Sequence, residues 1–245
     1  MLRCPHRRSS GTIIGTTDTM RNRMSTLQTL DRGLRALDII SQSPTGISVA
    51  ELAAELGVHR AICYRIVATL EAHSLVARTD SGRLRLGVGA AVLLSRFEPQ
   101  FLHGARPVLT ELADRTHATA FVAAAEGSEC VVLMVAEPSD AMFRVGYRVG
   151  SRHPLHRGAS GIAILALRPP NERDPEPVRQ ARRDGYSITT GELERGAVGV
   201  SAGVPADGQS LERSVGVVAL EGLDTDKAAA AVVDAARRLA RLVAT

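Results

Sequence analysis

The chain has 245 residues, of which 44% are hydrophobic and 23% are charged. This composition excludes a disordered or low-complexity protein and is typical of a soluble globular chain with enough apolar residues for two modest domains. The formal net charge of +4 comes entirely from residues 1–25, where five arginines stand against one aspartate. The overall basicity therefore does not by itself indicate nucleic-acid binding.

The cysteines and the N-terminal segment place the chain in a reducing compartment. Cys4, Cys63 and Cys130 are odd in number and lack paired spacing, which argues against a disulfide framework and a zinc ribbon. No stretch approaches the roughly 20 apolar residues of a membrane span. Residues 1–25 lack the apolar run of a signal peptide, so we expect a disordered basic tail and a cytoplasmic protein. The tail is either a basic arm on DNA or sequence upstream of the true start codon.

Residues 27–41 predict the first helix. Its apolar residues recur at helical spacing and are expected to face the core, namely Leu30, Leu34, Leu37 and Ile40, with Ile39 beside them. The turn sequence Ser43-Pro44-Thr45-Gly46 ends this helix.

Residues 48–74 predict two helices joined by a tight turn. Ser48 and Glu51 have the spacing of a capping box, and Gly57 ends the first helix because glycine adopts a left-handed backbone without penalty. The second helix, expected over residues 59–73, has an apolar stripe formed by Ile62, Ile66, Val67 and Leu70. The opposite face carries His59, Arg60, Tyr64 and Arg65. This pattern is typical of a helix-turn-helix, in which these four side chains contact bases and phosphates. Some of the four are equally explained as plain surface residues.

Residues 75–86 predict a hairpin turning at Asp80-Ser81-Gly82. Leu84 and Leu86 alternate inward, and the candidate DNA-binding arginines of this hairpin are Arg78, Arg83 and Arg85. A basic hairpin after a recognition helix is the wing of a winged helix, whose arginines lie along the phosphate backbone or enter the minor groove. The alternative is a surface hairpin with solvated arginines.

The remainder predicts a linker and a second domain. We expect a linker helix over residues 87–101 that packs in a dimer, and further helices over 105–116, 159–167 and 224–244. The last helix is expected to bury Ala230, Val233, Ala236, Leu239 and Leu242. Strands are expected over 118–125, 130–136, 143–149, 196–206 and 215–221, with a loop over 169–177. Mixed strands and helices joined by short loops indicate an antiparallel α+β domain.

Several segments of this sequence resemble a known family of proteins. The segments LDRGLRALDII, SVAELAAELGVHRAICYRIVATLEAHSLVAR and RLRLGVG resemble the N-terminal part of the isocitrate lyase regulator (IclR) family of bacterial transcription factors. The segments ARPVLTELADRTHATAFVAA, GYRVGSRHPLHRGASGIAILA, RRDGYSITTGEL and SVGVVALEG resemble its effector domain, in order. The resemblance covers residues 27–244.

The resemblance implies a winged helix-turn-helix over residues 26–87, a linker helix over 88–104 and a GAF-like effector-binding domain over 105–245. It implies a homodimer or homotetramer that binds a double-stranded DNA operator and responds to a small organic or aromatic acid, with no cofactor and no membrane association. The first alternative is a DNA-binding regulator whose second domain is degenerate and binds no ligand. The second, from another class, is an enzyme.

This sequence departs from the family pattern at three places. Ala61-Ile62 replaces the Ser-Thr that often starts the recognition helix, so either residue could touch a thymine methyl instead, or Ile62 is core. Ser74 stands where a glycine usually precedes the wing. The segment between Leu167 and Arg182 is shorter than usual, which puts the size of the ligand pocket in question.

Candidate effector-binding residues surround the start of the predicted helix at 159–167. Gly158, Ala159, Ser160 and Gly161 offer small side chains and free backbone N–H groups, which form a carboxylate cradle. The alternative is glycine required for tight helix–sheet packing. The resemblance adds Asp207, which is otherwise a turn residue, and the inward-facing Leu155, Val217 and Ala219.

The histidines and Cys130 offer a further candidate, either a metal site or a Cys–His catalytic site. His153 and His156 lie near each other, and His103, His117 and Cys130 lie elsewhere in the chain. Pro154 interrupts any helix between the two histidines, and no acidic residue stands nearby to orient them. The sequence therefore predicts neither catalytic nor metal-ligating residues.

Overall fold

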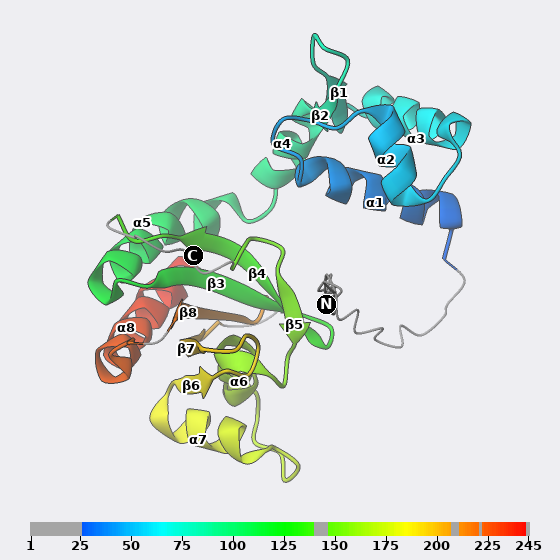
Figure 1. Cartoon of the computed structure of the whole chain (residues 1–245). Coiled ribbons are helices and arrows are strands. Elements are labelled where there is room, and N and C mark those ends of the chain that lie inside the picture. The colour runs from blue at the N-terminus through cyan, green and yellow to red at the C-terminus, as the bar shows by residue number, and fades with distance from the viewer. Residues whose placement is uncertain (1–25, 140–146, 207–210, 221, 244–245) are drawn as a thin grey trace, which may run out of the picture. The chain divides into compact units, whose positions relative to one another are not determined.

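The structure, a computed structural model, describes residues 26–139, 147–206, 211–220 and 222–243 (Figure 1). The chain forms two compact units, Met1–Leu94 and Ser95–Thr245. The boundary falls inside the segment where the sequence predicts a linker. None of the helices among the described residues is long and apolar enough to cross a membrane.

Among its described residues, the first unit contains four helices and a hairpin, and the fourth helix runs one residue past the boundary of the unit. The elements are α1 (Gln28–Ser41), α2 (Val49–Leu56), α3 (Arg60–Ala72), β1 (Val76–Arg78) and β2 (Leu84–Leu86), followed by α4 (Val88–Ser95). The predicted capping box is present, because the Ser48 side chain accepts from the Glu51 N–H and the Glu51 carboxylate accepts from the Ser48 N–H. Gly57 ends α2 in the left-handed conformation, as predicted.

The core of the first unit differs from the predicted set in α1. Ala36 and Ile40 are buried, with Leu37 and Ile39 partly buried against them. Leu30 and Leu34 were predicted to be core residues but are 58% and 59% exposed. Helical spacing identifies an apolar face but not what covers it, and α2 and α3 pack only against the C-terminal part of that face.

The predicted extent of the linker helix, residues 87–101, is wrong. α4 ends at Ser95, and a new helix, α5 (Pro99–Thr116), begins four residues later and includes the predicted 105–116 helix. Glu98 precedes α5 with a left-handed backbone (φ 40°), which breaks the two helices apart. Pro99 occupies the first turn, where a missing N–H costs nothing, so this proline begins a helix instead of ending one.

The second unit is built on an antiparallel six-stranded sheet. In sheet order the strands are β5 (Arg152–Pro154), β4 (Glu129–Ala136), β3 (Thr119–Glu126), β8 (Arg213–Leu220), β7 (Ala197–Val204) and β6 (Ser187–Thr190). β5 was not predicted, since a three-residue strand containing a proline gives no alternating signal. Its edge position tolerates Pro154. The strand predicted at 143–149 lies outside the described residues up to residue 146, and 147–149 are not in a strand.

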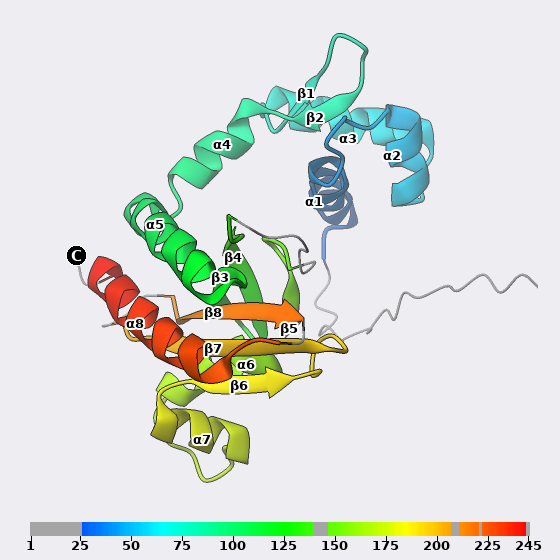
Figure 2. The same ribbon diagram turned by 60° about the vertical axis from the view of Figure 1, so that its left-hand side comes forward.

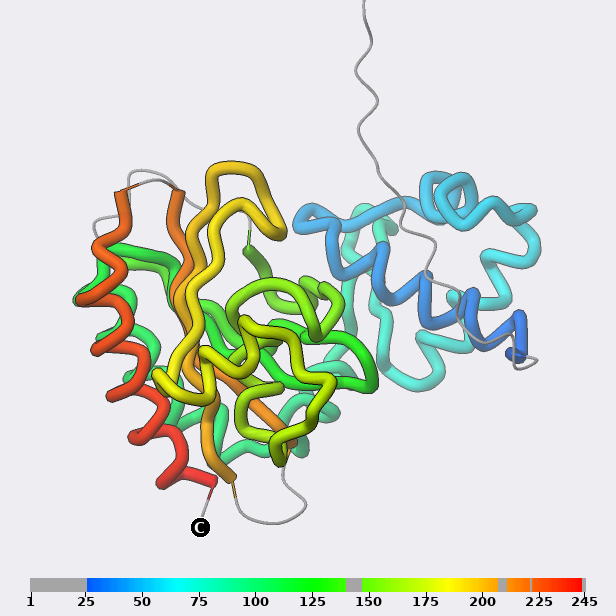
Figure 3. Tube along the Cα trace, turned by 90° about the horizontal axis from the view of Figure 1, so that it is seen from below, coloured from blue at the N-terminus to red at the C-terminus, as the bar shows by residue number. Residues whose placement is uncertain are grey.

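Helices cover both faces of this sheet. α5 and α8 (Thr225–Val243) pack side by side on one face, and α6 (Gly158–Leu167) and α7 (Glu176–Asp184) lie on the other (Figure 2). α8 runs beside β7 and β8 (Figure 3). Its buried face is rich in alanine, but Ala230 is exposed, contrary to prediction, and Val233 and Leu242 are only partly buried. The predicted α+β class is confirmed.

Candidate nucleic-acid interface and ligand cavity

The buried side of α3 is set by Cys63, Ile66, Val67 and Leu70. The prediction placed Ile62 on this stripe, but Ile62 is 40% exposed and Cys63 is fully buried. Residues 63, 66, 67 and 70 follow the 3.6-residue period along one face of α3. Residue 62 is rotated by about 100° from residue 63 and lies at the edge of that face. Ile62 is therefore not a core residue.

The exposed side of α3 gathers the residues that the sequence singled out. His59 caps the helix, and its Nδ1 accepts a hydrogen bond from the Ala61 N–H at 3.3 Å. Arg60, Ala61, Tyr64 and Arg65 are all exposed. Within the part of the chain that the structure describes, neither arginine forms an ion pair. This face therefore presents two uncommitted guanidinium groups and the positive end of the helix dipole.

The wing arginines differ in their freedom to move. Arg78 forms an ion pair with Glu71 at 2.8 Å. Arg83, predicted to point outward, is half-buried and donates from Nε and Nη2 to the Gly46 carbonyl oxygen at 3.0 and 2.9 Å. Arg85 is exposed and makes no ion pair among the described residues. Arg85 is thus the wing arginine best placed to contact a partner.

The base of the wing is fastened to α2 through Glu51. Arg83 Nη2 lies 3.2 Å from the Glu51 carboxylate, which also accepts from the Ser48 N–H. The Ser48 N–H and hydroxyl, with the Arg83 guanidinium, hold the pKa of Glu51 below its usual value. Leu84 anchors the hairpin in the core, but Leu86, predicted to point inward, is 38% exposed at the C-terminal end of β2.

A cavity of about 280 Å³ in the second unit adjoins the start of α6. It lies between the α6 face of the sheet and the loop that joins β6 to β7. Its walls are Phe121, Tyr147, Ser151, Arg152, His153, Ala159, Ser160, Thr189, Glu192, Leu193, Glu194, Ala197, Gly199 and Val218. The cavity therefore combines an apolar floor with a polar corner at Ser160.

Hydrogen-bonding groups without charge form this polar corner. His153 Nε2 lies 3.0 Å from the Ser160 hydroxyl and 3.5 Å from the Tyr147 hydroxyl. Burial lowers the pKa of His153. Burial also raises the pKa of Cys130, which packs on the same face of the sheet, to about 11, and that of Tyr147 to about 12. A thiol with so high a pKa is a poor nucleophile at neutral pH. The corner is suited to hydrogen bonding, not to catalysis.

The four predicted cradle residues have different surroundings. Ala159 and Ser160 line the cavity. The Gly158 N–H donates to the Glu192 carboxylate at 2.8 Å, and the Ala159 N–H donates to the Thr189 hydroxyl at 3.1 Å. A Cβ atom on Gly161 would lie 2.2 Å from the Leu155 carbonyl oxygen. Gly161 thus has the packing role that was the alternative interpretation.

The predicted wall residues Val217 and Ala219 lie on the wrong face of the sheet. Both pack in the cluster beneath α5 and α8, whereas Val218 between them faces the cavity. Side chains alternate along a strand, so an error of one residue moves the whole set to the other face. Leu155 is buried in the cluster around Phe121 and does not line the cavity. Asp207 lies outside the described residues.

Several residues of the cavity wall were not predicted from the sequence, for reasons that differ between them. Tyr147 and Thr189 line the same cavity although 42 positions separate them in the sequence, so no local pattern marks them. His153 was weighed as a metal ligand; among the described residues, no three His, Cys, Asp or Glu side chains are grouped to hold a metal ion. Glu192 has no sequence signal, because its contact with Gly158 joins residues 34 positions apart.

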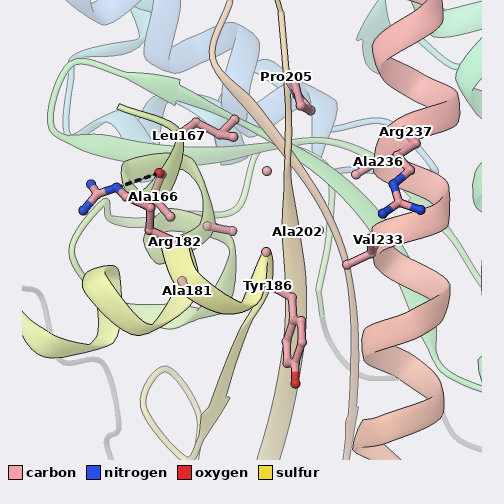
Figure 4. Close-up of a pocket in the computed structure, with 13 residues that line it drawn as sticks. Ala166, Leu167, Ala181, Arg182, Tyr186, Ala202, Pro205, Val233, Ala236 and Arg237 are labelled. Atoms are coloured by element: carbon pink, nitrogen blue, oxygen red, sulfur yellow. Dashed lines mark hydrogen bonds between the residues drawn. The ribbon is translucent and has the colours of Figure 1, made fainter. Parts of the chain in front are cut away.

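A second cavity, of about 250 Å³, lies between α6, α7, β7 and α8 (Figure 4). Its walls are mostly alanine and glycine. Arg182 on its wall donates to the Ala166 carbonyl at 3.1 Å and forms an ion pair with Asp174 at 2.9 Å. Its guanidinium is therefore already paired within the protein. These bonds tie down the segment between α6 and α7, which is the segment that the sequence marks as short.

Comparisons with known proteins agree with this architecture. Residues 29–80 match the IclR helix-turn-helix domain, and residues 98–176 match the bacterial transcriptional regulator IclR C-terminal domain. An HTH-type transcriptional regulator of Mycobacterium tuberculosis is 29% identical over 148 residues, which are 60% of this chain and 57% of the relative. The transcriptional repressor IclR of Escherichia coli is 25% identical over 147 residues, which are 57% and 53%. The chain thus spans a little over half the length of these curated relatives.

A solved structure shares the fold. The crystal structure of an IclR homologue from Microbacterium hydrocarbonoxydans, complexed with 4-hydroxybenzoate, superposes with a TM-score of 0.72 at 21% identity, covering 88% of this chain and 98% of that one. The two matched domains cover more than half of the chain, and the family they define comprises transcriptional regulators that are not enzymes. The chain belongs to the IclR family.

Proposed function

We propose that the protein is a cytoplasmic transcriptional regulator that binds an operator through α3 and the wing and responds to a small molecule held in the second unit. The observation that carries the proposal is the exposed face of α3. His59, Arg60, Tyr64 and Arg65 share this face, and nothing among the described residues neutralises its two guanidinium groups. An exposed basic face on the second helix of a helix-turn-helix is the surface that enters the major groove.

The individual contacts follow from the chemistry of these side chains. An arginine that pairs bidentately with guanine contributes about 1–3 kcal/mol of discrimination against other bases. Ala61 and the exposed Ile62 offer apolar contact to thymine methyl groups. Arg85 on the wing reaches phosphates, whereas Arg78 and Arg83 mainly hold the wing in place through their existing partners.

The cavity at the start of α6 supports a small-molecule effector. Its volume suits a compact ring, its floor is apolar, and its polar corner offers the Ser160 hydroxyl and the His153 ring. A structural relative was crystallised with 4-hydroxybenzoate. We therefore assign the effector to the small organic or aromatic acids. The presence of the cavity weighs against the alternative of a degenerate second domain.

Exposed apolar side chains support a homodimer or homotetramer. Leu30 and Leu34 are exposed on α1. Val88, Leu93 and Leu94 are exposed on α4. Exposed large apolar side chains on two helices of one unit support an interface between proteins. A dimer doubles the contacts that one modest recognition helix makes, which suits a pseudo-palindromic operator.

The test is a salt titration of operator affinity on the full chain. A duplex is first selected from a random pool by the wild-type protein. The variant Arg60→Ala/Arg65→Ala is expected to bind it more weakly, with a salt slope smaller by about 1 for each arginine that contacts a phosphate. Arg173→Ala, which removes an exposed arginine of the second unit, is the matched control and should leave the slope unchanged. An unchanged affinity together with an unchanged slope in the double variant would refute the proposed role of α3.

A further inference from the structure

The loop between β6 and β7, residues 191–196, covers the effector cavity. The backbone bond from the Gly191 N–H to the Ala197 carbonyl at 2.8 Å closes its base. Glu192, Leu193 and Glu194 all belong to the cavity wall. A single short loop thus supplies one side of the cavity and both of its carboxylates.

Glu192 fastens this loop to the start of α6. Its Oε2 accepts the hydrogen bond from the Gly158 N–H at 2.8 Å, and the Arg157 guanidinium donates to its backbone carbonyl. The side chain of Leu193 lies over Gly158, so closely that a Cβ atom there would come within 2.6 Å of Leu193 Cδ1. Arg157 at the N-cap provides no side-chain cap, so the carboxylate of Glu192 does so from another part of the chain.

This contact places the protein's own carboxylate where an acidic effector has most to gain. The N–H groups at the start of a ten-residue helix favour an anion, and among them the Gly158 N–H is already bonded to Glu192. A second carboxylate beside Glu192 and Glu194 would be repelled. The corner at Ser160 and His153 offers no positive charge to offset that repulsion, since burial lowers the pKa of His153, and Arg152 on the cavity wall is already paired with Glu126 and Glu129.

We propose that residues 191–196 form a displaceable lid, and that a monocarboxylic effector binds by taking the Gly158 N–H from Glu192. The inference rests on the proposed effector role of this cavity. The acid and the closed lid exclude each other, so the apparent affinity of the acid is its intrinsic affinity reduced by the fraction of protein with the lid open. The ligand class is a compact acid with an apolar or aromatic body that fits against Phe121 and Val218.

The experiment measures binding of 4-hydroxybenzoate, and of its neutral amide, to the full chain by calorimetry. Glu192→Ala is expected to bind the acid about tenfold more tightly than the wild type, as for a lid that is closed in about nine molecules of ten. Binding of the amide is expected to change less than threefold. Glu192→Gln keeps an acceptor for Gly158 without the charge and should give an intermediate gain. Glu172→Gln, which removes an exposed carboxylate of the second unit outside the cavity wall, is the matched control and should leave the affinity for the acid unchanged.

A second measurement does not depend on the ligand. Hydrogen exchange of the Gly158 amide, followed by NMR, should accelerate in Glu192→Ala and slow again when the acid is added. Equal affinity of the acid for wild type and Glu192→Ala, or no binding to either, would overturn the lid. If the acid releases operator DNA equally from both proteins, the effector function stands and the lid fails. If the acid binds Glu192→Ala more tightly but never affects operator binding, the lid stands and the effector function fails.

Discussion

Replacing Arg213 by alanine should destabilise the second unit by about 3 kcal/mol. Arg213 begins β8 and is 1% exposed, which makes it the largest fully buried side chain of the described residues. Its guanidinium pairs with Glu98, donates to the Leu211 carbonyl at 2.8 Å and lies 4.6 Å from the centre of the Phe101 ring. The substitution removes these bonds and leaves a cavity where the side chain was.

The magnitude follows from three contributions. Removing one partner of a buried pair costs about 3–5 kcal/mol, but Glu98 remains partly exposed and regains water, which lowers that figure. The lost contact with Phe101 adds about 0.5–1 kcal/mol. The Nε atom of Arg213 is buried without a hydrogen-bond partner, so its removal returns part of the loss. Arg213→Met fills the same space without that unpaired atom and should cost only about half as much as alanine.

Denaturant-dependent hydrogen exchange with mass spectrometry is the suitable assay. The chain has no tryptophan, and exchange reports each unit separately through its own peptides. Arg179→Ala removes an exposed arginine paired with Glu176 on α7 and should change stability by less than about 0.5 kcal/mol. A loss below about 1 kcal/mol for Arg213→Ala would refute the view that its buried contacts support the sheet. Equal losses for alanine and methionine would refute the role assigned to volume.

Three further predictions concern single positions. Ser74 has a left-handed backbone (φ 58°), so Ser74→Gly should stabilise the first unit by about 0.5–1 kcal/mol in urea unfolding. Gly161→Ala forces a Cβ atom against the Leu155 carbonyl and should cost about 3 kcal/mol, whereas a loss within experimental error would contradict the packing role. Burial raises the pKa of Cys130 from 9.0 to about 11. The stability that the protonated thiol contributes is therefore fully present below pH 9 and lost as pH rises through 11. The unfolding free energy of Cys130→Ala should therefore fall less steeply than that of wild type over this range.

The first unit was the more predictable of the two, because its signals are local. Ser48 and Glu51 stand three residues apart, and Gly57 follows the last apolar residue of α2, so the sequence itself marks both ends of that helix. The same locality limits the prediction for the wing. Nothing near Arg83 in sequence shows that its guanidinium bonds to Gly46, which lies 37 residues earlier.

The ligand cavity was less predictable because both faces of the sheet are buried. The segment VGVVAL of β8 has no polar side chain at any position, so its pattern does not say which residues face α6 and which face α5 and α8. The prediction placed Val217 in the cavity, where Val218 lies. Sheet order determines that face, and sheet order depends on pairings between β8 and strands nearly a hundred residues earlier.

The arrangement of charge around the cavity determines how a ligand could act on the protein. The fixed polar groups, Ser160 and His153, are neutral and belong to α6 and the edge of the sheet. Of the charged wall residues, Arg152 belongs to β5 and is paired with Glu126 and Glu129, whereas Glu192 and Glu194 belong to a loop. A ligand shifts an equilibrium only through contacts that differ between the two states. If an acid displaces Glu192, the contacts that differ are those of the loop, and any signal to the first unit must begin with release of the loop from α6.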